Sequence, residues 1–166
     1  MMENMKLHVV TPEGCAFSGE VRSVIVRTTE GDVGILKNHT NYVAAIKYGM
    51  LKITDPDGNA RIAACMNGFV SVEAEQVRIL ATTFEFADDL DIARANRAKE
   101  EADARLSDAS LTDEERAIAD ARRLRAENRI RVYELNQYPN GCCERMLAAS
   151  FFVRDFLYLY FAHLKQ

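Results

Sequence analysis

The fold is decided by the stretch from Val77 to Leu106, whose sequence is VRILATTFEFADDLDIARANRAKEEADARL. In its first part the apolar side chains Val77, Ile79 and Ala81 alternate with others, which is typical of a β-strand with one buried face. The pattern then changes, and Leu90 to Leu106 is expected to form a helix. The chain is therefore expected to pass here from a β-rich part to a helical part.

The preceding part of the chain is rich in turn signals. Seven of the eight glycines lie between Gly14 and Gly68, and none occurs from Phe69 to Asn140. Short β-type segments recur between turns, of which Asp55 to Gly58 and the two-residue hairpin turn Asn67-Gly68 are expected to be the clearest. Short hairpin connections join antiparallel strands. We therefore expect an antiparallel β-sandwich domain over residues 1–87.

The next 50 residues, 88–137, are expected to form an antiparallel α-helical hairpin. Asp88 is the expected N-cap of its first helix, and the capping box Thr112 to Glu115 is expected to begin a second that ends near Leu135. The facing stripes are expected to be Ala95, Ala98, Ala102 and Leu106 on the first helix, and Ala117, Ala121, Leu124, Val132 and Leu135 on the second, interrupted by Asn128. Alanine buries little apolar area, so the hairpin is expected to be weakly held and able to open.

Residues 138–166 form an atypical tail after the break at Tyr138 to Gly141. The run from Glu144 to Leu164 is expected to be an apolar helix long enough to cross a bilayer. Arg154 and Asp155 at its middle argue against a membrane span, because charges are costly there. An amphipathic helix that docks on a protein or membrane surface is expected instead.

Composition and charge exclude several classes of function. The net charge of −4 disfavours nucleic-acid binding, since phosphate recognition needs a basic surplus. The three histidines are far apart and the four cysteines have no zinc spacing, so no metal site and no catalytic site are expected. Cys15 and Cys65 are expected to be inert core thiols. No signal peptide is apparent at the start, which favours a cytosolic origin.

Five short segments in a fixed order resemble the epsilon chain of F-type ATP synthases. They are Thr11-Pro12-Glu13, Phe17-Ser18-Gly19-Glu20-Val21, Gly34-Ile35-Leu36 followed by His39, Gly49-Met50-Leu51-Lys52-Ile53, and Asn67-Gly68-Phe69-Val70-Ser71-Val72. The resemblance covers Met5 to Gln137. Lys37 and Asn41 depart from it, since many relatives have proline at these two positions.

The resemblance implies a non-catalytic rotor subunit that helps to couple proton flow to ATP synthesis, although the coupling ion could be sodium. The sandwich would contact the gamma chain and the c subunits of the rotor ring, with Gly34, Ile35, Leu36 and His39 at the ring-facing loop. An extended hairpin would bring Arg122 and Arg123 to acidic segments of the catalytic beta chains and inhibit ATP hydrolysis. The protein would be peripheral, at the cytoplasmic face of a bacterial cell membrane.

Two alternatives to this interpretation remain at this stage. The arginines of the second helix could instead be matched inside the hairpin by acidic residues, namely Asp91, Glu100, Glu101 and Asp103. The whole chain could also be a β-sandwich adaptor with a coiled-coil arm, unrelated to ATP synthase.

A regulatory nucleotide site is also implied by the resemblance. Leu90, Asp91, Arg94 and Ala95 match an ATP-binding motif of some bacterial epsilon chains, and Glu85, Arg125 and Arg129 fall at its other positions. Hairpin geometry independently places Arg94 opposite Arg125 and Leu90 opposite Arg129, which suits a polyphosphate. Glu101 replaces an expected arginine and should lower the affinity. Alternatively, Asp91 and Arg94 only pair at the helix start. No cofactor is expected to be required, and bound ATP would be regulatory. The sequence contains no Walker motif, so this chain alone is expected not to hydrolyse ATP.

Overall fold

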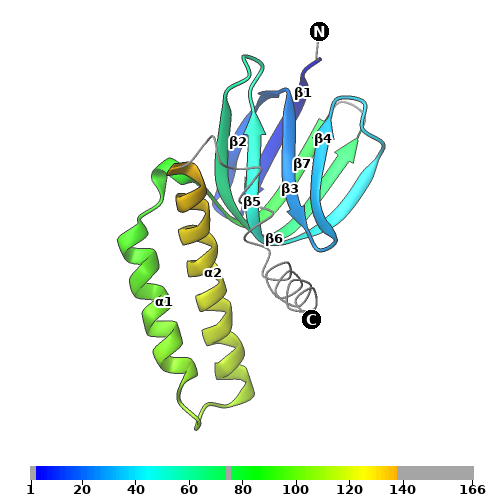
Figure 1. Ribbon diagram of the computed structural model, residues 1–166. Helices are drawn as coiled ribbons and strands as arrows, with labels where there is room; N and C mark the ends of the chain where they lie inside the picture. The colour runs from blue at the N-terminus through cyan, green and yellow to red at the C-terminus, as the bar shows by residue number, and fades with distance from the viewer. Residues whose placement is uncertain (1–2, 74–75, 138–166) are drawn as a thin grey trace, which may run out of the picture. The chain divides into compact units, whose positions relative to one another are not determined.

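The computed structural model describes residues 3–73 and 76–137, so the expectations for the tail, 138–166, lie outside the described residues. The strands are β1 (Met5–Thr11), β2 (Gly14–Val21), β3 (Ser23–Thr28), β4 (Gly31–Leu36), β5 (Tyr42–Thr54), β6 (Ala60–Glu73) and β7 (Gln76–Phe86). A 3₁₀ turn, η1 (Ala87–Asp89), leads to helices α1 (Ile92–Leu106) and α2 (Asp113–Gln137) (Figure 1). The expected β-sandwich followed by a helical hairpin is confirmed.

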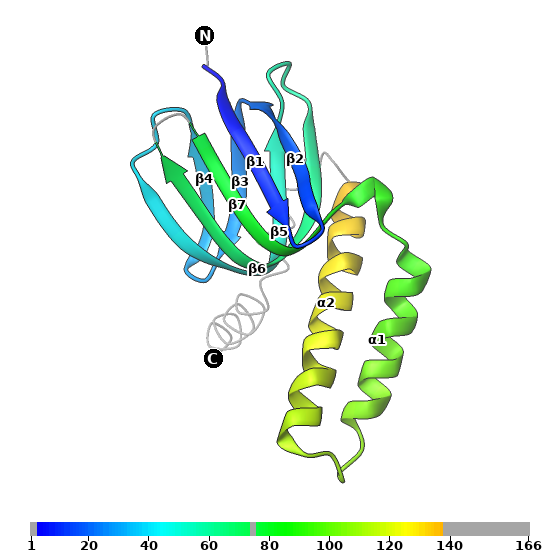
Figure 2. The ribbon, with the colours of Figure 1, turned by 180° about the vertical axis from the view of Figure 1, so that it is seen from behind.

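The strands form one hydrogen-bonded sheet in the order β2-β1-β7-β6-β5-β3-β4, which curls over a common core (Figures 1 and 2). Neighbouring strands are antiparallel except β1 and β7, which run parallel with Leu7 opposite Val77 and Val9 opposite Ile79. The two long strands β5 and β6 pair along their length, from Thr54 opposite Ala60 to Tyr42 opposite Val72. The first and last strands of the sandwich therefore lie side by side.

The core of the sandwich is built from alternate residues of all seven strands. Val77, Ile79 and Ala81 are buried as the alternating pattern predicts. Cys65 is also buried in this core, but the expectation for Cys15 is wrong, because Cys15 is exposed on β2. β2 is an edge strand of the sheet, and its first three residues, Gly14 to Ala16, are all exposed.

The expectation of a hairpin turn at Asn67-Gly68 is also wrong, because β6 continues through both residues. Asn67 adopts φ 45°, a left-handed conformation that asparagine tolerates better than most residues. Gly68 lies against the neighbouring strand so closely that a Cβ atom would be 1.8 Å from the carbonyl oxygen of Leu80. Asn67 and Gly68 therefore lie in the middle of strand β6, where Gly68 allows the close approach of β7. The turn at Asp55–Gly58 is confirmed by a hydrogen bond from Gly58 N to Asp55 O of 3.1 Å.

The two helices begin at polar caps. Asp91, and not the expected Asp88, is the N-cap of α1, and its Oδ1 accepts from Arg94 N at 2.9 Å. Asp88 lies in η1, because the chain makes a separate 3₁₀ turn before α1 starts. The capping box of α2 is confirmed: Thr112 Oγ1 accepts from Glu115 N at 3.3 Å, and Glu115 accepts from Thr112 N at 3.1 Å. Helix α2 continues to Gln137, slightly beyond its expected end.

The buried stripe of the hairpin differs from the expected one. Its buried alanines are Ala95 and Ala102 on α1, as expected, but Ala119 and Ala126 on α2. Of the other expected positions, Ala117 is exposed, and Ala98, Leu106, Ala121, Leu124 and Leu135 are only partly buried. The expected positions of α2 all lie on one face, of which Asn128 and Val132 are buried against the sandwich, whereas Ala119 and Ala126 lie on the opposite face at 100° per residue.

The second face of α2 packs on the sandwich. Val132 is fully buried in a small cluster with Ala64 and Met66 of β6, Ala87 of η1 and Leu90. Asn128, expected to interrupt an apolar stripe, is buried here, and its Nδ2 donates to the carbonyl oxygen of Gly49 at 3.2 Å. The polar residue therefore contributes a specific contact between the hairpin and strand β5.

None of the helices within residues 3–73 and 76–137 combines the length and the apolar character needed to cross a bilayer.

Candidate functional site

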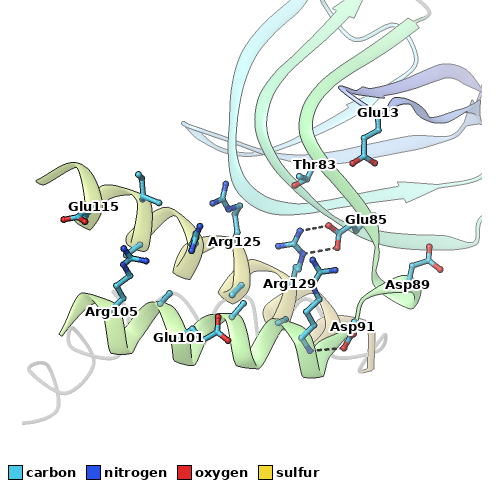
Figure 3. Close-up of a pocket in the computed structure, with 18 residues that line it drawn as sticks. Glu13, Thr83, Glu85, Asp89, Asp91, Glu101, Arg105, Glu115, Arg125 and Arg129 are labelled. Carbon is cyan, nitrogen blue, oxygen red and sulfur yellow. Dashed lines mark hydrogen bonds and ion pairs between the residues drawn. The ribbon is translucent and has the colours of Figure 1, made fainter. Parts of the chain in front are cut away.

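A cavity of about 920 Å³ lies between the two helices and the end of the sandwich that carries them; we call it the hairpin cavity. Its size is typical of small-molecule sites. Its charged lining consists of Arg94, Arg105, Arg122, Arg125 and Arg129 with Glu13, Glu85, Asp89, Asp91, Glu101 and Glu115 (Figure 3). The alanines of the hairpin make room for it, because small side chains leave the space between the helices unfilled.

The hairpin cavity brings together most residues of the expected nucleotide site. Glu85, Asp91, Arg94, Ala95, Arg125 and Arg129 all line it. Leu90 does not, since it packs in the apolar cluster with Val132. The three arginines that were expected to converge, Arg94 on α1 and Arg125 and Arg129 on α2, therefore all line this cavity.

Arg129 is held by Glu85 at the base of the hairpin. Its Nε donates to Glu85 Oε2 at 2.9 Å and its Nη2 to Oε1 at 2.5 Å, a bidentate pair. These hydrogen bonds hold the pKa of Glu85 below its ordinary value and raise the pKa of Arg129. The pair joins α2 to β7 and lies in the wall of the cavity.

The other arginines of the cavity are not neutralised in this way. Across residues 3–73 and 76–137, no salt bridge engages the guanidinium groups of Arg94, Arg105, Arg122 or Arg125. Four unpaired guanidiniums around one cavity make a favourable environment for a phosphate-bearing anion. Glu85 is neutralised by Arg129, but the other five carboxylates of the lining, Glu101 among them, oppose part of this attraction.

Some of the residues expected to contact partners are exposed in the structure, and one is buried. Gly34 is exposed, Leu36 is 50% exposed and His39 is partly exposed, with His39 N donating to Leu36 O at 3.1 Å. Ile35 is fully buried in the sandwich core, so its side chain supports the loop from within and cannot contact a partner. The alternation of β4 explains the difference, because neighbouring residues of a strand point to opposite faces.

The two expected partner-binding arginines of α2 also differ. Arg122 is exposed, whereas Arg123 bonds Asp120 at 2.8 Å and Glu127 at 3.2 Å on its own helix. The two carboxylates that bond Arg123 directly therefore lie on its own helix, while Asp103, one of the expected acidic residues on α1, also helps to raise the pKa of Arg123 by charge attraction. A partner that binds Arg123 has to displace two carboxylates.

Thr83 of β7 also lines the cavity but was absent from the expected site. It lies two residues before Glu85 in an extended strand, so both side chains point to the same face. The two-residue spacing between Thr83 and Glu85 is the sequence signal that could have identified Thr83 as a residue of the site.

Comparison with known proteins bears on these observations. The family model of the beta-sandwich domain of the ATP synthase delta/epsilon chain matches residues 4–87. An ATP synthase epsilon chain of Exiguobacterium sp. is 36% identical over 136 residues, covering 82% of this chain and 100% of the relative. The chain belongs to the ATP synthase epsilon chain family. This membership excludes the alternative of an adaptor unrelated to ATP synthase.

Other members of the epsilon chain family are similarly related. The ATP synthase epsilon chain of Ruminococcus albus is 42% identical over 132 residues, which cover 79% of this chain and 97% of that relative. Among solved structures, a chain of the Euglena gracilis mitochondrial ATP synthase superposes with a TM-score of 0.61 at 21% identity, covering 82% and 81% of the two chains. That structural likeness supports the fold of this epsilon chain family member.

Proposed function

We propose that this chain is a non-catalytic rotor subunit of a proton-translocating F-type ATP synthase and that its hairpin is a movable inhibitor of ATP hydrolysis. The observation that carries the proposal is the attachment of the hairpin. Within residues 3–73 and 76–137, the ion pair of Glu85 with Arg129, the amide hydrogen bond from Asn128 and a small apolar cluster around Val132 join it to the sandwich. An element held by a partly exposed ion pair and a small apolar cluster can detach without unfolding the sandwich.

The sandwich is the proposed platform for the gamma chain and the c subunits. Leu36 at the end of β4 and His39 in the loop after it lie on the surface of the sandwich and would contact the rotor ring, supported by the buried Ile35. The subunit would thereby be a peripheral component at the cytoplasmic face of the membrane. It would take part in coupling proton flow to ATP synthesis without a required cofactor.

Detachment of the hairpin would expose the arginines of α2 to a partner. Arg122 is exposed already, Arg123 can exchange its two intrahelical carboxylates, and Arg129 would lose Glu85. Acidic segments of the catalytic beta chains would satisfy all three by charge complementarity. Inhibition would follow because the bound hairpin obstructs rotation of the stalk.

Reconstitution with the cognate gamma chain and catalytic hexamer tests this role. We expect the chain to bind the gamma chain and lower ATP hydrolysis, and we expect the double variant Arg122→Ala/Arg123→Ala to bind equally but inhibit several-fold less. Arg97→Ala, an exposed arginine of α1 outside the cavity, is the matched control and should inhibit like the wild type. A chain that forms no complex with the gamma chain would refute the rotor role.

We further propose that the hairpin cavity binds ATP and that bound ATP favours the attached hairpin. The unpaired guanidiniums of Arg94 and Arg125 support this proposal, because they lie on different helices and a phosphate chain could bridge them. A ligand that binds only the attached state shifts the equilibrium toward it. Glu101 is expected to weaken the affinity but not to abolish it.

Calorimetric titration of the full chain with ATP tests the site. Removal of one charge-assisted phosphate contact should weaken binding by about tenfold in Arg94→Ala and in Arg125→Ala. The control Arg97→Ala should bind as the wild type does. The site is refuted when wild-type protein shows no binding, or when both cavity variants bind unchanged.

A further inference from the structure

The contacts that attach the hairpin lie on neighbouring residues of three strands. Met50 of β5 is opposite Ala64 of β6, and Ala64 is opposite Glu85 of β7. Glu85 binds α2 through its ion pair, and the carbonyl oxygen of Gly49, the residue before Met50, accepts the amide hydrogen bond from α2. The hairpin is therefore joined to one row of residues across the sheet, and Met50 belongs to that row.

Met50 is packed at this joint without being fully enclosed. It is a partly buried residue that packs against the apolar cluster containing Leu90 and Val132. Met5 and Met66, the other methionines within residues 3–73 and 76–137, are only 3% and 1% exposed. A methionine side chain adapts well to irregular apolar contacts, but its thioether can be oxidised where solvent reaches it. Among the described methionines, Met50 is therefore the one that a small solute reaches in the folded protein.

We propose that the thioether of Met50 is an oxidation site, and that its modification by hydrogen peroxide releases the hairpin from the sandwich. The inference rests on the proposed movable hairpin and adds a chemical regulation to it. The sulfur forms an S–O bond with one oxygen of the peroxide as the O–O bond breaks. The proton on that oxygen passes to the leaving hydroxide, which becomes water. The sulfur is thereby oxidised by two electrons to a sulfoxide, and the peroxide is reduced.

The sulfoxide changes which state of the hairpin is favoured. In the attached state its polar oxygen lies against a cluster whose five buried residues have no polar side chain. A polar group that is buried without a hydrogen-bond partner is costly, whereas water hydrates the sulfoxide once the hairpin detaches. Oxidation therefore shifts the equilibrium toward the detached hairpin. Detachment in turn exposes Met50, so a variant that loosens the hairpin should be oxidised faster.

The experiment treats the full chain with dilute hydrogen peroxide and then with a thiol reductant. The reductant reverses sulfenic acids and disulfides at cysteines such as the exposed Cys15, but it leaves the sulfoxide in place. Peptide mass mapping should find a sulfoxide at Met50 and none at Met5 or Met66. Native-state hydrogen exchange should then show about tenfold lower protection in α2, the effect of one unsatisfied polar group, and unchanged protection in β1 and β7.

Variants separate oxidation of Met50 from other effects of peroxide. Met50→Leu keeps an apolar side chain of similar volume, so its α2 should be protected as in the untreated wild type, with or without peroxide. Met50→Gln introduces a polar group and should lower the protection of α2 without peroxide. Asn128→Ala loses the hydrogen bond to Gly49 and should speed the oxidation of Met50 several-fold, whereas the exposed control Asn96→Ala should not.

The outcomes separate this inference from the proposed function. The inference is overturned if Met50 stays unmodified at a peroxide dose that oxidises methionine in a short peptide, if α2 keeps its protection after oxidation, or if Met50→Leu loses as much protection as the wild type. The oxidised chain is also reconstituted with untreated gamma chain and catalytic hexamer, where it should inhibit ATP hydrolysis more strongly than the untreated chain. If oxidation lowers the protection of α2 but leaves hydrolysis unchanged, the Met50 site stands and the inhibitory role of the hairpin is wrong.

Discussion

Glu85 and Arg129 are 44 residues apart in the chain, yet they form the bidentate ion pair that joins the hairpin to the sandwich. Both side chains remain partly exposed, at 38% and 25%, so solvent screens the attraction. The pair is therefore a modest contribution that can be broken, which suits a contact at the base of a movable hairpin.

Acid should weaken this ion pair. The hydrogen bonds from Arg129 lower the pKa of Glu85 below its ordinary value of 4.5, so its stabilisation is complete above pH 4.5 and is lost as pH falls through the lowered pKa. We expect the difference in melting temperature between the wild type and Glu85→Gln to disappear over this range. Glu101→Gln is the control, at a cavity carboxylate that forms no ion pair with any residue that the structure describes. A difference that stays constant with pH would contradict the prediction.

The two described cysteines should differ sharply in reactivity. Cys15 is exposed, whereas burial raises the pKa of the Cys65 thiol to about 12. Because the thiolate is the reactive form, a maleimide at neutral pH should modify Cys15 rapidly and Cys65 only after unfolding. Peptide mass mapping after a short labelling pulse measures both. Rapid modification of Cys65 in the folded protein would show that its core position is wrong.

At the scale of the elements, strand β6 depends on a glycine. A Cβ atom at residue 68 would be 1.8 Å from Leu80 O, a backbone atom that can move only with its strand. Gly68→Ala should therefore lower the free energy of unfolding by at least about 2 kcal/mol, the cost of forced overpacking. Gly34→Ala is the matched control, since open space surrounds that glycine. Chemical denaturation of both variants tests this, and equal stabilities would contradict the close approach.

The same elements show what sequence could predict. Alternation placed Val77, Ile79 and Ala81 in the core, and the capping box placed the start of α2, because both depend on neighbours along the chain. Asn67-Gly68 was mistaken for a turn, because the proximity of Leu80 arises from pairing between strands. The buried face of α2 was misplaced for a similar reason. Local sequence does not reveal that one helix packs against both a second helix and a sheet.

The candidate site was predictable to a similar degree. Hairpin geometry predicted that Arg94 and Arg125 would share one cavity, since a short loop fixes which residues of two helices face each other. The contributions of Glu13 and Thr83 could not be predicted in this way, because they depend on how the hairpin meets the sandwich. Leu90 was assigned to the site but belongs to the apolar cluster around Val132.

At the scale of the whole molecule, the hairpin and the sandwich should open separately. Native-state hydrogen exchange should show lower protection in α2 than in β6 and β7, because few contacts hold α2 in place. Asn128→Ala removes the hydrogen bond to Gly49 O and should lower the protection of α2 by about tenfold while leaving the sheet unchanged.

Asn96→Ala, at an exposed position of α1, is the control for this experiment and should leave exchange in α2 unchanged. If Asn128→Ala lowers protection in the sheet as much as in α2, the two parts unfold as one cooperative unit, and independent detachment of the hairpin is refuted.

The parallel pairing of β1 with β7 sets the order of events during synthesis. Residues 6–10 must wait for their partners at residues 76–80, so the sandwich cannot close until β7 has left the ribosome. Contacts between such distant residues make folding slow. Helices α1 and α2 emerge afterwards, when the surface that receives them is complete. A nascent chain therefore acquires its sandwich before its hairpin, and the edge of β1 that β7 covers is open to other chains only during that interval.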